Sequence, residues 1–153
     1  MSRRDEIKLT DDELSAFVAE QRVVICATNG PGGWPHLMPL WYVIRDGQLW
    51  AWTYGKSQKV RNLEREPRAT LQLEAGDSYD QLRGVMIEAE TVIHRDTDAV
   101  SMLGAELAER YGSGALSPEA WEAIRAQAPK RVALQFVPRR VVTWDHRKLG
   151  GTY

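Results

Sequence analysis

The sequence predicts an antiparallel α+β domain, built as a small β-barrel with helices at its ends. About six segments have the alternation or apolar content of strands, and most of them follow one another directly along the chain. Asp46-Gly47 is a strong hairpin signal between two of these segments. The 153 residues, 43% hydrophobic and 27% charged, have the size and composition of one globular domain. We therefore expect a single domain over residues 1–153.

The N-terminal part of the chain predicts a helix followed by a hairpin. Thr10 and Glu13 have the spacing of a capping box, and the apolar residues after them follow a helical period. A helix of about ten residues is therefore expected to begin at this box. Residues 21–28 follow as a strand, and the glycine-rich turn at 29–33 leads into a second strand at 34–45.

The second strand is apolar on both of its faces. One face carries Leu37, Trp41 and Val43, and the other carries Met38, Leu40, Tyr42 and Ile44. Because only one face of a small barrel is interior, the outer face has to meet a helix, a cofactor or a second subunit. This pattern favours a homodimer, with a helix packed over the outside as the alternative.

The third strand, residues 48–54, ends in a glycine that precedes a short cationic helix at 57–65. The helix directs Val60 and Leu63 to the core and stops at Pro67. A helix start has unpaired N–H groups and the positive end of the helix dipole, which suit a phosphate. The lysines and the serine at this start would add charge and a hydroxyl. A polar helix face that meets water is the other interpretation.

The rest of the chain supplies the remaining strands and helices. Strands are expected at 68–74, 82–94 and 130–137, with 141–144 as a possible extension beyond Pro138, and helices are expected at 96–111 and from 117 onward.

Composition and motifs exclude several function classes. The net charge of −1 gives no general attraction to nucleic acid or acidic membranes. No apolar stretch approaches the ~20 residues of a membrane span, so a cytoplasmic protein is expected. The three histidines lie far apart and the single cysteine lies in an apolar strand, so no metal site is expected. The chain also has no nucleophile elbow, dinucleotide loop or Walker motif.

The remaining candidate site is an aromatic surface beside a cationic phosphate seat. Trp52 and Tyr54 lie just before the glycine and the cations. This combination suits a planar heterocycle with a phosphate tail. It also suits single-stranded nucleic acid on a small barrel, although the nearly neutral net charge argues against nucleic acid.

The chain resembles the flavin and deazaflavin split-barrel oxidoreductases. These include pyridoxamine phosphate oxidase and the actinobacterial coenzyme F420-dependent reductases. The most specific part of the resemblance is Lys56-Ser-Gln-Lys59-Val-Arg61-Asn62-Leu63 followed by Pro67-Arg-Ala-Thr70, in this position after the hairpin strands. The similarity runs from Thr10 to about Trp144 and implies a six-stranded antiparallel split β-barrel, the FMN-binding split barrel, with peripheral helices.

The resemblance also implies a homodimer with each cofactor in a groove between two barrels. The implied cofactor-binding residues are Met38, Pro39, Leu40, Trp52, Thr53, Lys56, Ser57, Gln58, Lys59, Arg61 and Asn62, with Tyr79 from the neighbouring subunit. Trp41 is expected either as a wall of the substrate pocket or as a tryptophan of the dimer core. No side-chain acid or base is evident, and Tyr54 or solvent is the candidate proton donor.

One departure from the family separates its branches. The vitamin-B6 oxidases end in an Arg-Leu-x-Pro motif, which this chain lacks. The resemblance therefore favours the deazaflavin branch, whose longer anionic tail would suit Lys56 and Arg61. We expect a coenzyme F420-dependent reductase that transfers a hydride to a small unsaturated or planar acceptor. The alternatives are an FMN-dependent oxidase or reductase and a non-catalytic flavin- or haem-binding barrel.

Overall fold

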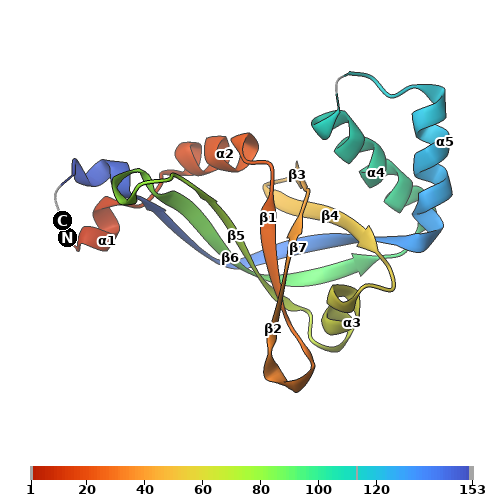
Figure 1. Cartoon of the computed structure of the whole chain (residues 1–153), viewed down its shortest axis with the longest axis horizontal. Coiled ribbons are helices and arrows are strands. Elements are labelled where there is room, and N and C mark those ends of the chain that lie inside the picture. Colours follow the sequence, from red (N-terminus) through yellow and green to blue (C-terminus); the bar gives the residue numbers. More distant parts are fainter. Residues whose placement is uncertain (1, 113, 152–153) are drawn as a thin grey trace.

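A computed structural model describes residues 2–112 and 114–151, and it confirms the antiparallel α+β split barrel. In these residues one antiparallel sheet curls into a half-barrel with the strand order β2-β1-β5-β6-β7-β4-β3 (Figure 1). The strands are β1 (Val24–Asn29), β2 (Pro35–Leu40), β3 (Val43–Arg45), β4 (Gln48–Tyr54), β5 (Arg68–Ala75), β6 (Arg83–His94) and β7 (Arg131–Asp145). The α-helices are α1 (Arg3–Glu6), α2 (Asp11–Glu20), α3 (Gln58–Arg65), α4 (Thr97–Tyr111) and α5 (Pro118–Gln127). Short 3₁₀ turns lie at η1 (Pro31–Gly33), η2 (Tyr79–Gln81), η3 (Ala128–Lys130) and η4 (His146–Leu149).

The expectation of a single strand over 34–45 is wrong, and the described sheet has seven strands instead of six. The segment breaks between β2 and β3, which lie at opposite edges of the sheet. Tyr42 causes the break because its polar groups bond outside the ladder. Its N–H donates to the Tyr111 hydroxyl over 3.0 Å, and its own hydroxyl lies 2.6 Å from the carbonyl of Val18.

The last strand is continuous through its proline, as the sequence suggested. A bulge in the β6–β7 ladder pairs Glu88 with Arg140 and Ala89 with Pro138, so that Arg139 is the extra residue. A bulge tolerates proline because a residue there needs no ladder N–H.

Two hydrophobic clusters hold the fold together. The barrel interior contains fully buried side chains from β5, β6 and β7, such as Leu71, Val85 and Leu134. A second cluster forms where α4 packs over the outer face of β4 and β7, through residues such as Leu103 and Ala133. In Figure 1 the two long helices α4 and α5 lie together at one end of the sheet. The alternative of a covering helix therefore holds for β3 and β4, whereas β2 keeps an open outer face.

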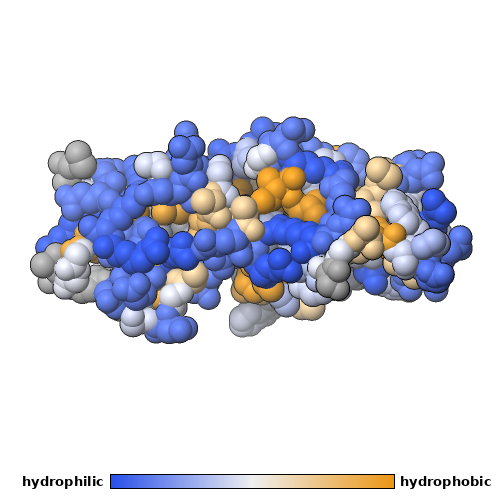
Figure 2. All heavy atoms as spheres, turned by 90° about the horizontal axis from the view of Figure 1, so that it is seen from above, coloured by the Kyte–Doolittle hydropathy of each residue, from blue (hydrophilic) through white to orange (hydrophobic). Residues whose placement is uncertain are grey.

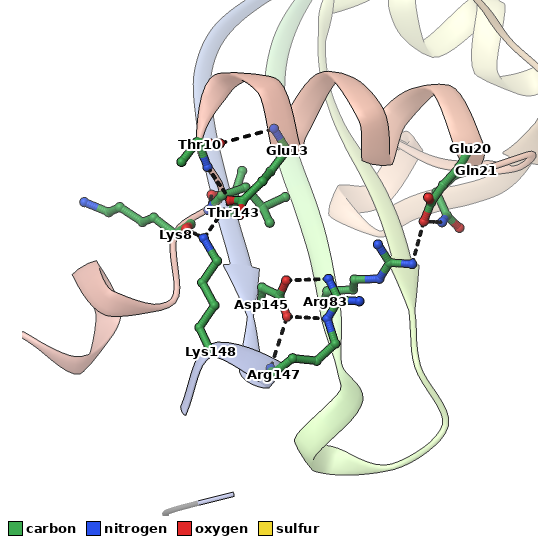
Figure 3. Close-up of polar contacts among 11 residues, drawn as sticks. Lys8, Thr10, Glu13, Glu20, Gln21, Arg83, Thr143, Asp145, Arg147 and Lys148 are labelled. Carbon is green, nitrogen blue, oxygen red and sulfur yellow. Dashed lines mark hydrogen bonds and ion pairs between the residues drawn. The ribbon is translucent and has the colours of Figure 1, made fainter. Parts of the chain in front are cut away.

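The two ends of the chain are tied together at the other end of the molecule (Figure 3). Asp145 is 3% exposed and accepts hydrogen bonds from the Arg147 guanidinium at 2.9 and 2.7 Å. Lys148 Nζ lies 2.6 Å from a Glu13 carboxylate oxygen and 2.6 Å from the carbonyl of Lys8. Through Lys148, the C-terminal turn η4 thus binds the segment that leads into α2.

No helix within the described residues combines the length and the apolar character needed to cross a membrane.

Candidate functional site

The predicted phosphate seat lies at the start of α3, directly after β4. Ser57 is the N-cap residue of this helix. Its backbone N–H donates to the carbonyl of Tyr54 over 3.0 Å, which fixes the turn, but its Oγ is buried without a hydrogen-bond partner in the described structure. A buried hydroxyl usually has a partner, so this atom is a candidate ligand contact.

Lys59 extends from α3 into the barrel and not into solvent. Its side chain is 7% exposed, and Nζ lies 3.0 Å from the hydroxyl of Thr53. None of the ion pairs among the described residues involves this ammonium group, and its burial lowers the pKa of Lys59. The interpretation as a helix face in water is therefore wrong for Lys59. The site holds a buried cation that lacks an acidic partner, an arrangement that a bound anion would stabilise.

A buried amide network fixes the first turn of α3 against the sheet. Asn62 is completely buried, and its Nδ2 donates to the Thr28 hydroxyl of β1 over 3.0 Å. Its Oδ1 accepts from the side chain of Gln58 over 2.8 Å. Because both polar atoms of the Asn62 amide form hydrogen bonds inside the protein, Asn62 holds the Gln58 side chain in a fixed position.

The last residues of β4 alternate between the inside and the outside of the barrel. Thr53 points inward to Lys59, whereas Trp52 points outward beneath α4. The Arg131 guanidinium lies 4.6 Å from the Trp52 ring centroid, and the ring edge lies against Gly104. Trp52 therefore has little free ring surface, because Arg131 covers one part of the ring and α4 another.

This contact yields a prediction for Gly104. A Cβ at this position would lie 2.5 Å from Cζ3 of Trp52 and 3.0 Å from a methyl group of Ile124. We expect Gly104→Ala to destabilise the protein by about 1–2 kcal/mol through overpacking, measured by urea denaturation. Ala99→Gly, at an exposed position of the same helix, is the control that reports the difference in helix propensity between the two residues. An equally stable Gly104→Ala variant would show that Trp52 moves freely, contrary to this packing.

A positively charged bay opens beside the same strand end. It has a volume of about 540 Å³ and is lined by Tyr54, Gly55, Lys56, Arg95, Pro129, Lys130, Arg131 and Val132. None of these residues is acidic. Arg61 is exposed on α3 outside this bay. Tyr54 is 46% exposed, so its hydroxyl is accessible to solvent.

Strand β2 presents the predicted ring-lining residues at an open sheet edge. It pairs only with β1, so its other edge has free backbone groups among the described residues. Met38 is 42% exposed and Pro39 is also exposed, whereas Leu40 is buried. Seen from above, on another side than the tip of the β1–β2 hairpin, the surface also has apolar residues in the middle of the molecule, between polar regions (Figure 2). If these residues line a cofactor ring, as predicted, Met38 and Pro39 can contribute their side chains, and Leu40 can contribute only its backbone.

Tyr79 does not join this site within one protomer. It lies in η2 between β5 and β6, which packs against the C-terminal turn η4, whereas α3 lies near the end of β4 (Figure 1). There His146 Nδ1 lies 2.9 Å from the Tyr79 carbonyl oxygen, and the two rings are 4.8 Å apart. A contact between Tyr79 and a cofactor on α3 would require a second copy of the chain.

A second hollow adjoins the amide network. This groove, of about 720 Å³, is lined by Ala27, Thr28, Asn29, Pro35, Arg68, Ala69, Thr70, Glu88, Ala89, Glu90 and Arg139. Arg68, Ala69 and Thr70 of the motif thus line the same groove as Thr28, whose hydroxyl accepts the hydrogen bond from Asn62. The roles of Thr28, Gly104 and Arg131 were not predictable from the sequence, because their partners lie far away along the chain and no local pattern marks them.

Comparison with known proteins identifies the family. A sequence model described as pyridoxamine 5'-phosphate oxidase matches residues 10–145. The chain belongs to this family. None of the curated proteins matches it.

Solved structures of the same fold include relatives with different properties. The conserved hypothetical protein Rv2991 from Mycobacterium tuberculosis is 40% identical, with a TM-score of 0.89 over 100% of this chain and 95% of that one. An F420 reductase is 21% identical, with a TM-score of 0.63 over 83% of this chain and 94% of that one. HutZ, the haem storage protein from Vibrio cholerae, is 17% identical, with a TM-score of 0.68 over 87% and 94%. The last two share the fold with this pyridoxamine 5'-phosphate oxidase family member.

Proposed function

We propose that this protein is a homodimeric coenzyme F420-dependent reductase that transfers a hydride to a small unsaturated or planar acceptor. Two observations carry the proposal: the buried ammonium group of Lys59 has no acidic partner among the described residues, and the Ser57 hydroxyl at the start of the same helix α3 has no hydrogen-bond partner there. A phosphate there would satisfy both groups and the first N–H groups of the helix.

The residues of the site have separate tasks in this proposal. Ser57, Gln58 and Lys59 hold the phosphate, and Asn62 keeps Gln58 in place through the bond to Thr28. The open edge of β2 offers backbone donors and acceptors to the polar edge of the cofactor ring. The reduced cofactor supplies the hydride when it is bound, and the protein orients the acceptor and excludes water. Tyr54 or solvent supplies the proton.

The charge distribution around the bay favours the deazaflavin over FMN. Lys56, Arg95, Lys130 and Arg131 line this bay. Arg95 is paired with Glu64 at 3.4 Å, and none of the ion pairs among the described residues involves Lys56, Lys130 or Arg131. Arg61 is also exposed, on α3. FMN ends at its phosphate, whereas coenzyme F420 has a longer anionic tail that these cations would bind. FMN remains the second candidate, because the phosphate seat alone suits either cofactor.

The homodimer is supported by the surfaces that one protomer leaves open. Leu37, Met38, Trp41 and Ile44 are each at least 40% exposed along β2 and β3. Tyr79 could reach a cofactor only from a second copy. We propose that the two barrels pack so that each cofactor lies between β2 of one protomer and η2 of its partner.

Cofactor titration of the purified protein tests the proposal. We expect coenzyme F420 to bind at micromolar concentration or below with a change in its fluorescence, and FMN to bind more weakly. If a flavin stays bound to the protein through gel filtration, the cofactor is FMN and not F420. A haem absorption band would favour the haem-binding alternative. Failure to bind either flavin or deazaflavin at micromolar concentration would contradict the reductase proposal.

A further inference from the structure

The inner side of α3 carries two polar side chains that are anchored on different strands of the barrel. Lys59 and Asn62 lie three residues apart, so they share one face of the helix. The Asn62 amide donates to Thr28 of β1, and the Lys59 ammonium group donates to Thr53 of β4, both over 3.0 Å. In the described sheet β1 and β4 are separated by β5, β6 and β7. Two buried threonine hydroxyls therefore hold α3 from two sides.

Thr53 faces the interior of the barrel. The residue is 6% exposed, whereas the next residue, Tyr54, is 46% exposed, as expected when successive residues of a strand face opposite sides. Thr53 pairs across the ladder with Val132 of β7, which is buried as well. Its hydroxyl accepts the hydrogen bond from Lys59 inside this closed space. The Thr53 side chain is therefore a contact of Lys59.

The Lys59 ammonium group has little else to fix its position. Burial lowers the pKa of Lys59, and Cys26 of β1 is the titratable residue that acts on it electrostatically. Burial also raises the pKa of Cys26 to about 12, so this thiol is neutral at pH 7 and supplies no counter-charge. An ammonium group has three N–H donors, and the described structure uses one of them, in the bond to Thr53. The other two are available to a ligand.

We propose that Thr53 is a positioning residue of the phosphate seat, whose hydroxyl holds the Lys59 ammonium group so that its other N–H donors are available to the phosphate. The proposal rests on the proposed cofactor-binding function. It gives the Thr53 side chain a different role from the ring contact that the family resemblance implies. A cation that is fixed before the ligand arrives loses less conformational entropy on binding than a free lysine. Thr53 should therefore matter for the phosphate and not for the ring.

Coenzyme F420 and its phosphate-free fragment, 8-hydroxy-5-deazariboflavin, separate these two roles when each is titrated into the full-length protein by fluorescence. Thr53→Val keeps the shape of the side chain and removes the hydroxyl. We expect this variant to bind F420 about three- to tenfold more weakly, the effect of one lost hydrogen bond, and to bind the fragment as tightly as the wild type. Thr53→Ser keeps the hydroxyl and should bind F420 within about twofold of the wild type.

Two further variants show whether Thr53 acts through Lys59. In the Lys59→Met protein, Thr53→Val should cause no additional loss of F420 affinity, because the group that it positions is already absent. Thr91→Val is the matched control. Thr91 is another buried threonine of the barrel, 7% exposed, and its hydroxyl has no hydrogen-bond partner in the described structure. This variant should bind F420 normally.

A measurement without cofactor keeps the result independent of the reductase function. The pKa of Lys59 can be followed by NMR of carbon-13-labelled lysine, with the Lys59→Met spectrum as the assignment. It should be lower in Thr53→Val than in the wild type, because a hydrogen bond to the charged form favours that form. Inorganic phosphate should raise the pKa of Lys59 in the wild type, and less so in Thr53→Val. Circular dichroism and urea denaturation report whether each variant is folded.

The possible outcomes are distinct. Equal losses of affinity for F420 and for the fragment in Thr53→Val would make Thr53 a ring contact and overturn the proposal. Unchanged F420 affinity or an unchanged pKa of Lys59 in this variant would also contradict it. If the wild type binds neither ligand, the reductase proposal fails, and the response of the Lys59 pKa to inorganic phosphate decides the role of Thr53 alone. Thr53→Ala, which also lacks the hydroxyl, replaces Thr53→Val if the valine variant does not fold.

Discussion

Replacement of Lys59 by methionine is expected to weaken binding of the phosphate-bearing cofactor by about 1.5–3 kcal/mol. This is the usual contribution of a charge-assisted hydrogen bond. Methionine keeps most of the buried volume, so the change removes the charge and not the packing. The dissociation constant, measured by fluorescence titration, should therefore rise by one to two orders of magnitude, at ~1.4 kcal/mol for each factor of ten.

Folding stability should respond to the same substitution in the opposite sense. Burial lowers the pKa of Lys59, so in the cofactor-free protein the charged form is held at a cost. We expect Lys59→Met to be at least as stable as the wild type to urea while it binds the cofactor less tightly. Lys8→Met, at a side chain that is 59% exposed, is the matched control and should leave cofactor affinity unchanged. Unchanged affinity in Lys59→Met would remove this residue from the phosphate seat.

The pH dependence of binding follows from the lowered pKa. Lys59 attracts an anion only when it is protonated, and in the free protein it loses its proton at a lower pH than an ordinary lysine near 10.4. As the pH rises, the affinity for the cofactor should therefore begin to fall before the pH reaches the value at which an ordinary lysine loses its proton. Lys59→Met should lack this alkaline loss.

The second large effect is expected at Asp145, where loss of the carboxylate should weaken the C-terminal turn η4, whose Lys148 binds the segment before α2. Asp145→Asn should lower the free energy of unfolding by about 1.5–3 kcal/mol, because hydrogen bonds from a guanidinium to a buried carboxylate are among the stronger ones. The Arg147 guanidinium is bound at 2.9 and 2.7 Å. The bond from the Asp145 N–H to the Ile7 carbonyl, at 2.7 Å, belongs to the backbone and is retained in the variant. Urea denaturation at pH 7 measures the effect.

The contribution of Asp145 has a defined pH window. Hydrogen bonds from Arg147 lower the pKa of Asp145, so its folded-state pKa lies below the unfolded value near 3.9. The stabilisation is complete above the unfolded pKa and disappears as pH falls through the folded pKa. The stability difference between wild type and Asp145→Asn should therefore shrink in acid. Asp5→Asn is the exposed control: its pKa is also lowered, to about 2, but a smaller change is expected because solvent screens it. Equal losses in both variants would contradict the role of burial.

The candidate site was only partly readable from the sequence. The local pattern around residues 56–63 identified the helix start correctly, since N-caps and helix dipoles depend on neighbours in the chain. The direction of the Lys59 side chain was not predictable, because it depends on Thr53 and the barrel interior. The covering of Trp52 by Gly104 and Arg131 likewise depends on α4 and β7, which lie 50 residues or more away in sequence.

The strands, too, were predictable only where they depend on neighbouring residues in the chain. Alternation and the Asp46-Gly47 turn identified β1, β2, β4 and the β3–β4 hairpin, because periodicity of two and turn chemistry are local properties. The break at Tyr42 had no local signal, since its tyrosine and tryptophan are good strand residues. Tyr111 and Arg110, almost 70 residues further along the chain, bind the backbone of Tyr42 and separate β2 from β3.

Sequence alone thus established the family, the antiparallel barrel, its helices and the position of a cationic helix start after β4, all of which follow from periodicity, capping and motif order. The tertiary structure established which polar groups are buried without partners, that β2 and β3 take opposite edges of the sheet, and that Trp41 is stacked on Tyr111. These features arise from contacts between residues that are distant in the chain. Such contacts depend on how helices and strands pack against one another, and no local pattern in the sequence encodes that packing.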